Sequence, residues 1–97
     1  MPDADRWALR PLVRLSWHEW PEGAVAFDEV SGQIVEFDPL GAAVMACIEE
    51  SPSSIPAMAD ELARDLGHSA DAEFTAAVRH VVQQFQVLGW VEPIIDR

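Results

Sequence analysis

Ninety-seven residues allow one domain with a modest hydrophobic core, and a composition of 49% hydrophobic and 24% charged residues is ordinary for a folded protein. Six arginines, no lysine and 17 acidic residues give a formal net charge of −11. This charge disfavours nucleic acid and anionic membranes and favours neutral or basic peptides and proteins as partners. No apolar run approaches the roughly 18 residues that span a bilayer, and the acidic start MPDADRWALR is unlike a secretory signal, so we expect a cytoplasmic protein.

The first half of the chain has the pattern of strands. Residues 1–10 are expected to be a flexible lead-in to a single domain over residues 1–97. Apolar residues then alternate with polar or small ones over Leu12–His18, Ala24–Asp28 and Gln33–Phe37, the period of strands with one buried face. Turn-forming residues separate these segments. The pattern predicts a three-stranded antiparallel meander whose third strand lies at an edge.

The second half is expected to be helical. Apolar residues recur there at helical spacing, and each helix follows a residue whose side chain can cap backbone N–H groups. The fold class is therefore α+β and winged-helix-like, with a three-stranded antiparallel sheet followed by three helices. The expected caps are Asp38, Ser54 and Ser69, for helices over Pro39–Glu50, Ile55–Leu66 and Ala70–Leu88.

Residues with catalytic or metal-binding chemistry do not form a recognisable site. His18, His68 and His80 fall in a strand, a loop and a helix, without carboxylates or cysteines at ligand spacing. Cys47 lies on the apolar side of its helix, where cysteine usually behaves as a small hydrophobe, and the carboxylate pairs lie on polar faces. We therefore predict no catalytic residue, no metal site and no cofactor.

The edge strand and the long third helix suggest a groove. An edge strand offers unpaired backbone groups to which an extended peptide can add as a further strand. The apolar arc of the third helix is wide enough to form the opposite wall. Proline at Val35 is then predicted to weaken peptide binding, if the N–H of that residue faces outward.

Over roughly residues 12–92 the chain resembles PqqD and the related RiPP recognition elements, small domains that hold the leader of a ribosomally made peptide for a modifying enzyme. PqqD's glycine-rich lead into the first strand is missing. Trp7-Ala8-Leu9 and Ser31-Gly32 look most like the PqqD-like proteins of HPr-rel-A systems, found beside an HPr-kinase-like protein. The segments that carry the family resemblance are Phe37-Asp38-Pro39, Ala42-Ala43-Val44, Ile55, Ala59-Asp60-Glu61-Leu62 and Leu88-Gly89-Trp90-Val91.

The resemblance implies a non-catalytic peptide chaperone in natural product biosynthesis, with a precursor or leader peptide bound between the third strand and the third helix. A modifying enzyme or an HPr-kinase-like protein is the implied protein partner. The implied peptide-binding residues are Gln33, Ile34, Val35, Glu36 and Phe37 on the strand and Phe74, Ala77, Val78, Val81, Gln84, Phe85 and Leu88 on the helix.

Two other functions remain open from the sequence. The second and third helices also resemble a helix-turn-helix pair, which would make the protein a winged-helix DNA-binding regulator. Alternatively, the chain is an interaction subunit of a kinase-like or radical enzyme and binds no peptide. An exposed edge can also be covered by a second copy, so a homodimer is compatible with the sequence.

Overall fold

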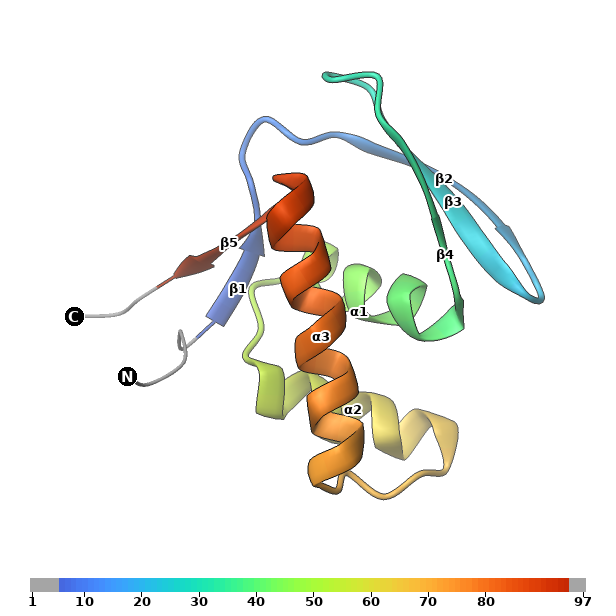
Figure 1. Ribbon diagram of the computed structural model, residues 1–97, viewed down its shortest axis with the longest axis vertical. Coiled ribbons are helices and arrows are strands. Elements are labelled where there is room, and N and C mark those ends of the chain that lie inside the picture. Colours follow the sequence, from blue (N-terminus) through green and yellow to red (C-terminus); the bar gives the residue numbers. More distant parts are fainter. Residues whose placement is uncertain (1–5, 95–97) are drawn as a thin grey trace.

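The computed structural model describes residues 6–94. Two small sheets and three helices make up the fold, with the helices grouped on one side of the larger sheet (Figure 1). The elements in chain order are β1 (Arg6–Leu9), β2 (Leu15–Trp20), β3 (Gly23–Asp28), β4 (Ile34–Phe37), α1 (Pro39–Glu50), α2 (Ile55–Leu66), α3 (Ala72–Leu88) and β5 (Val91–Ile94).

The predicted meander is confirmed as a three-stranded antiparallel sheet in the order β2-β3-β4. β2 begins three residues later than expected because the preceding segment turns, with the N–H of Val13 donating to the carbonyl of Arg10 at 3.0 Å. The strand then continues to Trp20, which pairs with Gly23 across a two-residue turn. β4 begins at Ile34 rather than Gln33, and its position at the sheet edge agrees with the prediction.

The second sheet was not expected. Residues 6–9, which the sequence placed in a flexible lead-in, form β1 and pair antiparallel with β5, in register from Arg6 with Ile94 to Leu9 with Val91. The Trp7 backbone also exchanges two hydrogen bonds with Ser53, at 2.7 and 3.0 Å. The prediction of a flexible segment is therefore wrong for these residues, while residues 1–5 lie outside the described part of the chain.

Each of the three helices begins at a residue whose side chain caps it. Asp38 accepts a hydrogen bond from the N–H of Gly41, and Ser54 accepts one from Ala57, as expected for α1 and α2. α3 is shorter than predicted because Asp71, not Ser69, is its N-cap, and the Asp71 carboxylate accepts from the Phe74 N–H at 2.8 Å. An anionic cap also interacts favourably with the helix dipole.

The end of α3 fixes the start of β5. Gly89 has a φ of 83°, a left-handed conformation that L side chains rarely adopt. Its N–H and that of Trp90 donate to the carbonyls of Gln86 and Phe85, both at 3.0 Å. The Trp90 ring then stacks on Phe85 with an interplanar angle of 9°, an apolar contact that often accompanies a glycine helix end.

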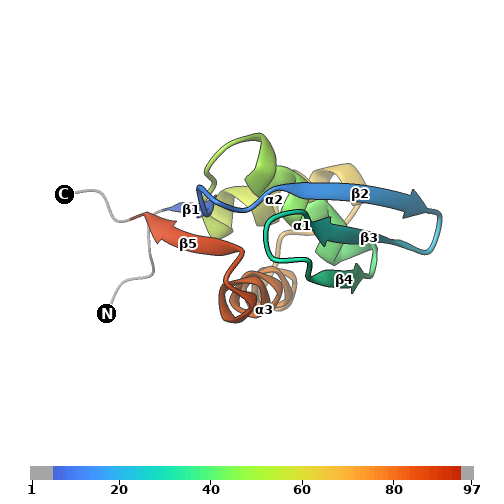
Figure 2. The same cartoon turned by 90° about the horizontal axis from the view of Figure 1, so that it is seen from above.

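The core lies between the helices and the inner face of the larger sheet. α3 runs beside both β4 and β5 when the molecule is viewed from above (Figure 2). None of the helices within residues 6–94 combines the length and apolar character of a membrane span. The largest fully buried side chains are those of Trp90, Met45, Ile48, Met58, Val44, Val78, Val82 and Val91.

Candidate functional site

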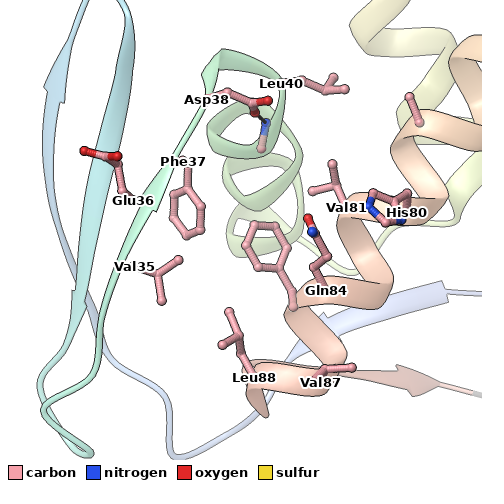
Figure 3. A pocket seen from close by; sticks show the side chains of 13 residues that line it. Val35, Glu36, Phe37, Asp38, Leu40, His80, Val81, Gln84, Val87 and Leu88 are labelled. Carbon is pink, nitrogen blue, oxygen red and sulfur yellow. Dashed lines mark hydrogen bonds between the residues drawn. The ribbon is translucent and has the colours of Figure 1, made fainter.

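A groove of about 770 Å³ separates β4 from α3. Figure 3 shows Val35 and Phe37 pointing from the strand toward Gln84 and Leu88 of the helix, with Glu36 directed away. Val35 and Phe37 share a face because successive strand residues point to opposite sides of a sheet. The lining residues are Val35, Glu36, Phe37, Asp38, Leu40, Gly41, Ala77, His80, Val81, Gln84, Phe85, Val87 and Leu88.

The floor of the groove is aromatic. The Phe37 ring is 7% exposed and meets the Phe85 ring edge-on, with centroids 5.0 Å apart. It also contacts Trp17 of β2 at 5.3 Å and Trp90 at 6.0 Å. Phe37 thus joins the sheet to α3 beneath the groove, and the floor is held in place by packing that does not depend on a ligand.

One end of the groove wall is fixed by a polar contact. The indole Nε1 of Trp90 donates to the Oε1 of Gln33 at 3.1 Å. At the same turn, the buried Asp28 carboxylate accepts from the backbone N–H groups of Arg14 and Val30 and from the Ser31 hydroxyl. These hydrogen bonds, that of Ser31 foremost, lower the pKa of Asp28. The turn before β4 is therefore held by hydrogen bonds within the chain.

The free side of β4 exposes backbone groups. The N–H of Asp28 donates to the carbonyl of Gln33 at 2.8 Å, which sets the phase of the β3–β4 ladder. Because hydrogen-bonded and non-bonded pairs alternate in an antiparallel ladder, Val35 bonds to Ala26, and the N–H and C=O groups of Ile34 and Glu36 point away from β3. Within residues 6–94, β4 has no strand neighbour on that side.

The polar groups around the groove include two carboxylates. Glu36 is exposed at the strand edge with its carboxylate directed away from the groove, and Asp38 uses one oxygen to cap α1 at 2.7 Å from the Gly41 nitrogen. The helix wall contributes the neutral Gln84 amide and the His80 imidazole, both on exposed residues. The rim thus favours a neutral or basic ligand over an acidic one.

The structure brings most of the predicted site residues together in the groove but places four elsewhere. Ile34 is 66% exposed on the outer face of the sheet, whereas Val78 is fully buried in the core. The side-chain oxygen of Gln33 accepts the hydrogen bond from the Trp90 indole. Phe74 lies in the first turn of α3, stacked on the His68 ring at 5.9 Å. The predicted residues that do line the groove are Val35, Glu36, Phe37, Ala77, Val81, Gln84, Phe85 and Leu88.

Five lining residues were missed. Ala77, Val81, Gln84 and Leu88 recur at spacings of three or four, so they form one stripe along α3 beside the core stripe. The sequence signal for this stripe was Val87, an apolar residue outside the expected core positions of the helix. The missed residues are Asp38, Leu40, Gly41, His80 and Val87.

Cys47 has the properties of an unreactive thiol. Partial burial raises its pKa to about 11, and the nearby Glu61 carboxylate, which accepts a hydrogen bond from the thiol at 3.4 Å, acts in the same direction. Within residues 6–94, groups of three or more His, Cys, Asp or Glu side chains suited to a metal ion are absent.

The raised pKa predicts slow alkylation of Cys47. Only the thiolate reacts, so at pH 8 its reaction with iodoacetamide should be roughly 10- to 100-fold slower than that of a free cysteine. The rate should still rise tenfold per pH unit at pH 10, because the pKa lies near 11. Glu61→Gln removes a charge and should speed the reaction. A plateau below pH 9 in the pH–rate profile, followed by mass spectrometry, would contradict this assignment.

The fold and groove define a class of small α+β domain in which an open strand edge faces an amphipathic helix. Residues 23–91 match the family described as coenzyme PQQ synthesis protein D (PqqD), and the chain belongs to this family. Its fold is similar to that of a solved structure described as "Lasso peptide synthetase B1 complexed with the leader peptide", with a TM-score of 0.66 and 18% sequence identity. The similarity covers 90% of this chain and 98% of the other. Comparison with curated proteins finds no match.

Proposed function

We propose that this protein is a non-catalytic adaptor that binds the leader segment of a ribosomally made precursor peptide and presents it to a separate modifying enzyme. The leader adds to β4 as a further strand and inserts side chains into the groove. The observation that carries the proposal is the open side of β4, where the backbone groups of Ile34 and Glu36 face outward beside an apolar floor.

Two comparisons support the proposal. The chain belongs to the PqqD family, and the structure with a similar fold is described as a complex with a leader peptide. Strand addition also explains why such a site needs few specific side chains, since main-chain hydrogen bonds supply affinity and pockets for alternate side chains supply selectivity. Because precursor peptides are made by ribosomes, the proposal places the protein in the cytoplasm.

The winged-helix alternative has little support from the surface of α3. A recognition helix needs cations to contact phosphates, and Arg79 is the only arginine or lysine of this helix. His80, Gln84 and the apolar residues of the groove occupy its flank facing β4. The interaction-subunit alternative differs in binding no peptide, so the same titration decides it.

An NMR titration tests the proposal. The probe is a synthetic peptide spanning the leader of the precursor encoded nearest to this gene, added to the 15N-labelled protein. We expect the largest amide shifts over Ile34–Phe37 and along the groove flank of α3. Val81→Asp, which places a charge in the groove, should weaken binding at least tenfold. Shifts confined to β1 and β5, or no shifts at all, would overturn the proposed site; a scrambled peptide is the control.

A further inference from the structure

The outer face of the three-stranded sheet carries exposed apolar side chains. Ile34 is 66% exposed, Phe27 39% and Trp20 37%. The helices lie on the opposite side of this sheet (Figure 1), so nothing within residues 6–94 packs over these side chains as a layer. Scattered apolar residues are normal on a surface, but these share one face and continue to its open edge.

The sheet register arranges this face in rows. Phe27 pairs with Ile34, and Val25 pairs with Glu36. Side chains directly opposite in neighbouring strands contact one another, so the first row is apolar and the second ends in a carboxylate at the edge. A hollow beside Glu36 is also lined by Trp20, Glu22, Phe37 and Asp38.

A peptide strand added to β4 would present its side chains to both faces. Antiparallel addition continues the existing sheet, in which all pairs are antiparallel. The peptide residue opposite Val35 then points into the groove, and the residues opposite Ile34 and Glu36 point to the outer face. Every strand-bound peptide therefore meets the apolar row and the carboxylate as well as the groove.

We propose that the sheet's outer face is a second specificity surface, which selects a peptide with the order basic, apolar, apolar. This rests on the proposed function. In the N-to-C direction, an arginine or lysine lies beside Glu36, an apolar side chain enters the groove opposite Val35, and a second apolar side chain covers Ile34. Charge complementarity identifies the occupant as a peptide rather than a second copy, since each copy carries a net charge of −11.

A display selection provides the test, with a phage library of fully randomised 12-residue peptides as the probe and the whole protein as the target. For the wild type we expect enrichment of peptides with the predicted order. For Glu36→Lys the first position should change to aspartate or glutamate. Glu50→Lys, the same charge change at the exposed end of α1, is the control and should leave the selected order unchanged.

Affinities of a selected peptide then test the pairing directly. Replacing its basic residue by glutamate should weaken binding to the wild type about fivefold, and Glu36→Lys should restore it, an effect that shrinks at high salt. Ile34→Ser should weaken binding about threefold. If the selected peptides lack a basic residue, or keep it when Glu36 is replaced by lysine, the proposal of a second specificity surface is overturned. Peptide binding in the groove would still stand. If no peptide is enriched, or the edge binds a second copy instead, both are overturned.

Discussion

Glu36→Pro is expected to reduce leader-peptide affinity about 10- to 100-fold while leaving the fold intact. The N–H of Glu36 points to the open side of β4, so proline removes a donor that only an added strand would use. Leaving a peptide carbonyl without its hydrogen-bond donor in a desolvated groove costs about 1–3 kcal/mol of binding free energy. Isothermal titration calorimetry with the leader peptide measures the affinity, and circular dichroism verifies the fold.

Val35→Pro is the matched comparison, one residue away. The Val35 N–H faces Ala26 within the sheet, so proline there breaks the β3–β4 ladder and should lower the melting temperature markedly. The sequence left open whether the Val35 N–H faces outward. The alternation of hydrogen-bonded pairs between β3 and β4 shows that the N–H groups of Ile34 and Glu36 do so instead. If Val35→Pro kept its stability but lost binding, and Glu36→Pro kept both, the assigned phase would be reversed.

Local signals explain why much of the fold could be predicted. Asp38 and Ser54 lie directly before prolines or apolar runs, and their caps form as the sequence indicates. Alternation over five to seven residues located the strands of the meander, because apolar residues recur at every second position in a strand with one buried face. At the start of α3 the expected cap, Ser69, was wrong: Asp71 is the N-cap, and its carboxylate is equally suited to accept from a backbone N–H.

The β1–β5 sheet had no comparable signal. Each strand has four residues, too few for a period to stand out, and the pairing joins Arg6 to Ile94 across nearly the whole chain. Its stability comes from tertiary contacts, including the buried Trp7 ring and the bonds to Ser53. Such contacts depend on how the helices pack against the strands, which a four-residue strand sequence does not reveal.

The binding groove could also be predicted only in part from the sequence. The edge position of the third strand followed from the order of elements, and it places Val35 and Phe37 in the groove. The flank of α3 that lines the groove could not be predicted in this way. The rotation of the helix about its own axis depends on the core against which it packs. The core stripe includes Val78 and the groove stripe lies one side-chain row away, at Val81, Gln84 and Leu88.

Phe37→Ala is expected to destabilise the protein by about 3–5 kcal/mol, much of the 5–15 kcal/mol available to a domain of this size. The ring is nearly buried and contacts Trp17, Phe85 and Trp90, so its removal leaves a cavity where the sheet meets α3. Urea unfolding followed by tryptophan fluorescence measures the loss.

Two further variants separate the contribution of Phe37 to stability from its position beside the peptide. Ile34→Ala, on the same strand but 66% exposed, should change the free energy of unfolding by less than about 0.5 kcal/mol. Phe37→Leu keeps much of the apolar volume and should remain folded. Its peptide affinity can therefore be measured in a folded protein that lacks the aromatic contacts of Phe37. If Phe37→Ala were as stable as Ile34→Ala, β4 would be held to α3 by other contacts, and the groove floor would not be preformed. A large difference in stability between Phe37→Ala and Ile34→Ala is expected because Phe37 links the edge strand to the core. The groove floor is therefore formed in the absence of peptide.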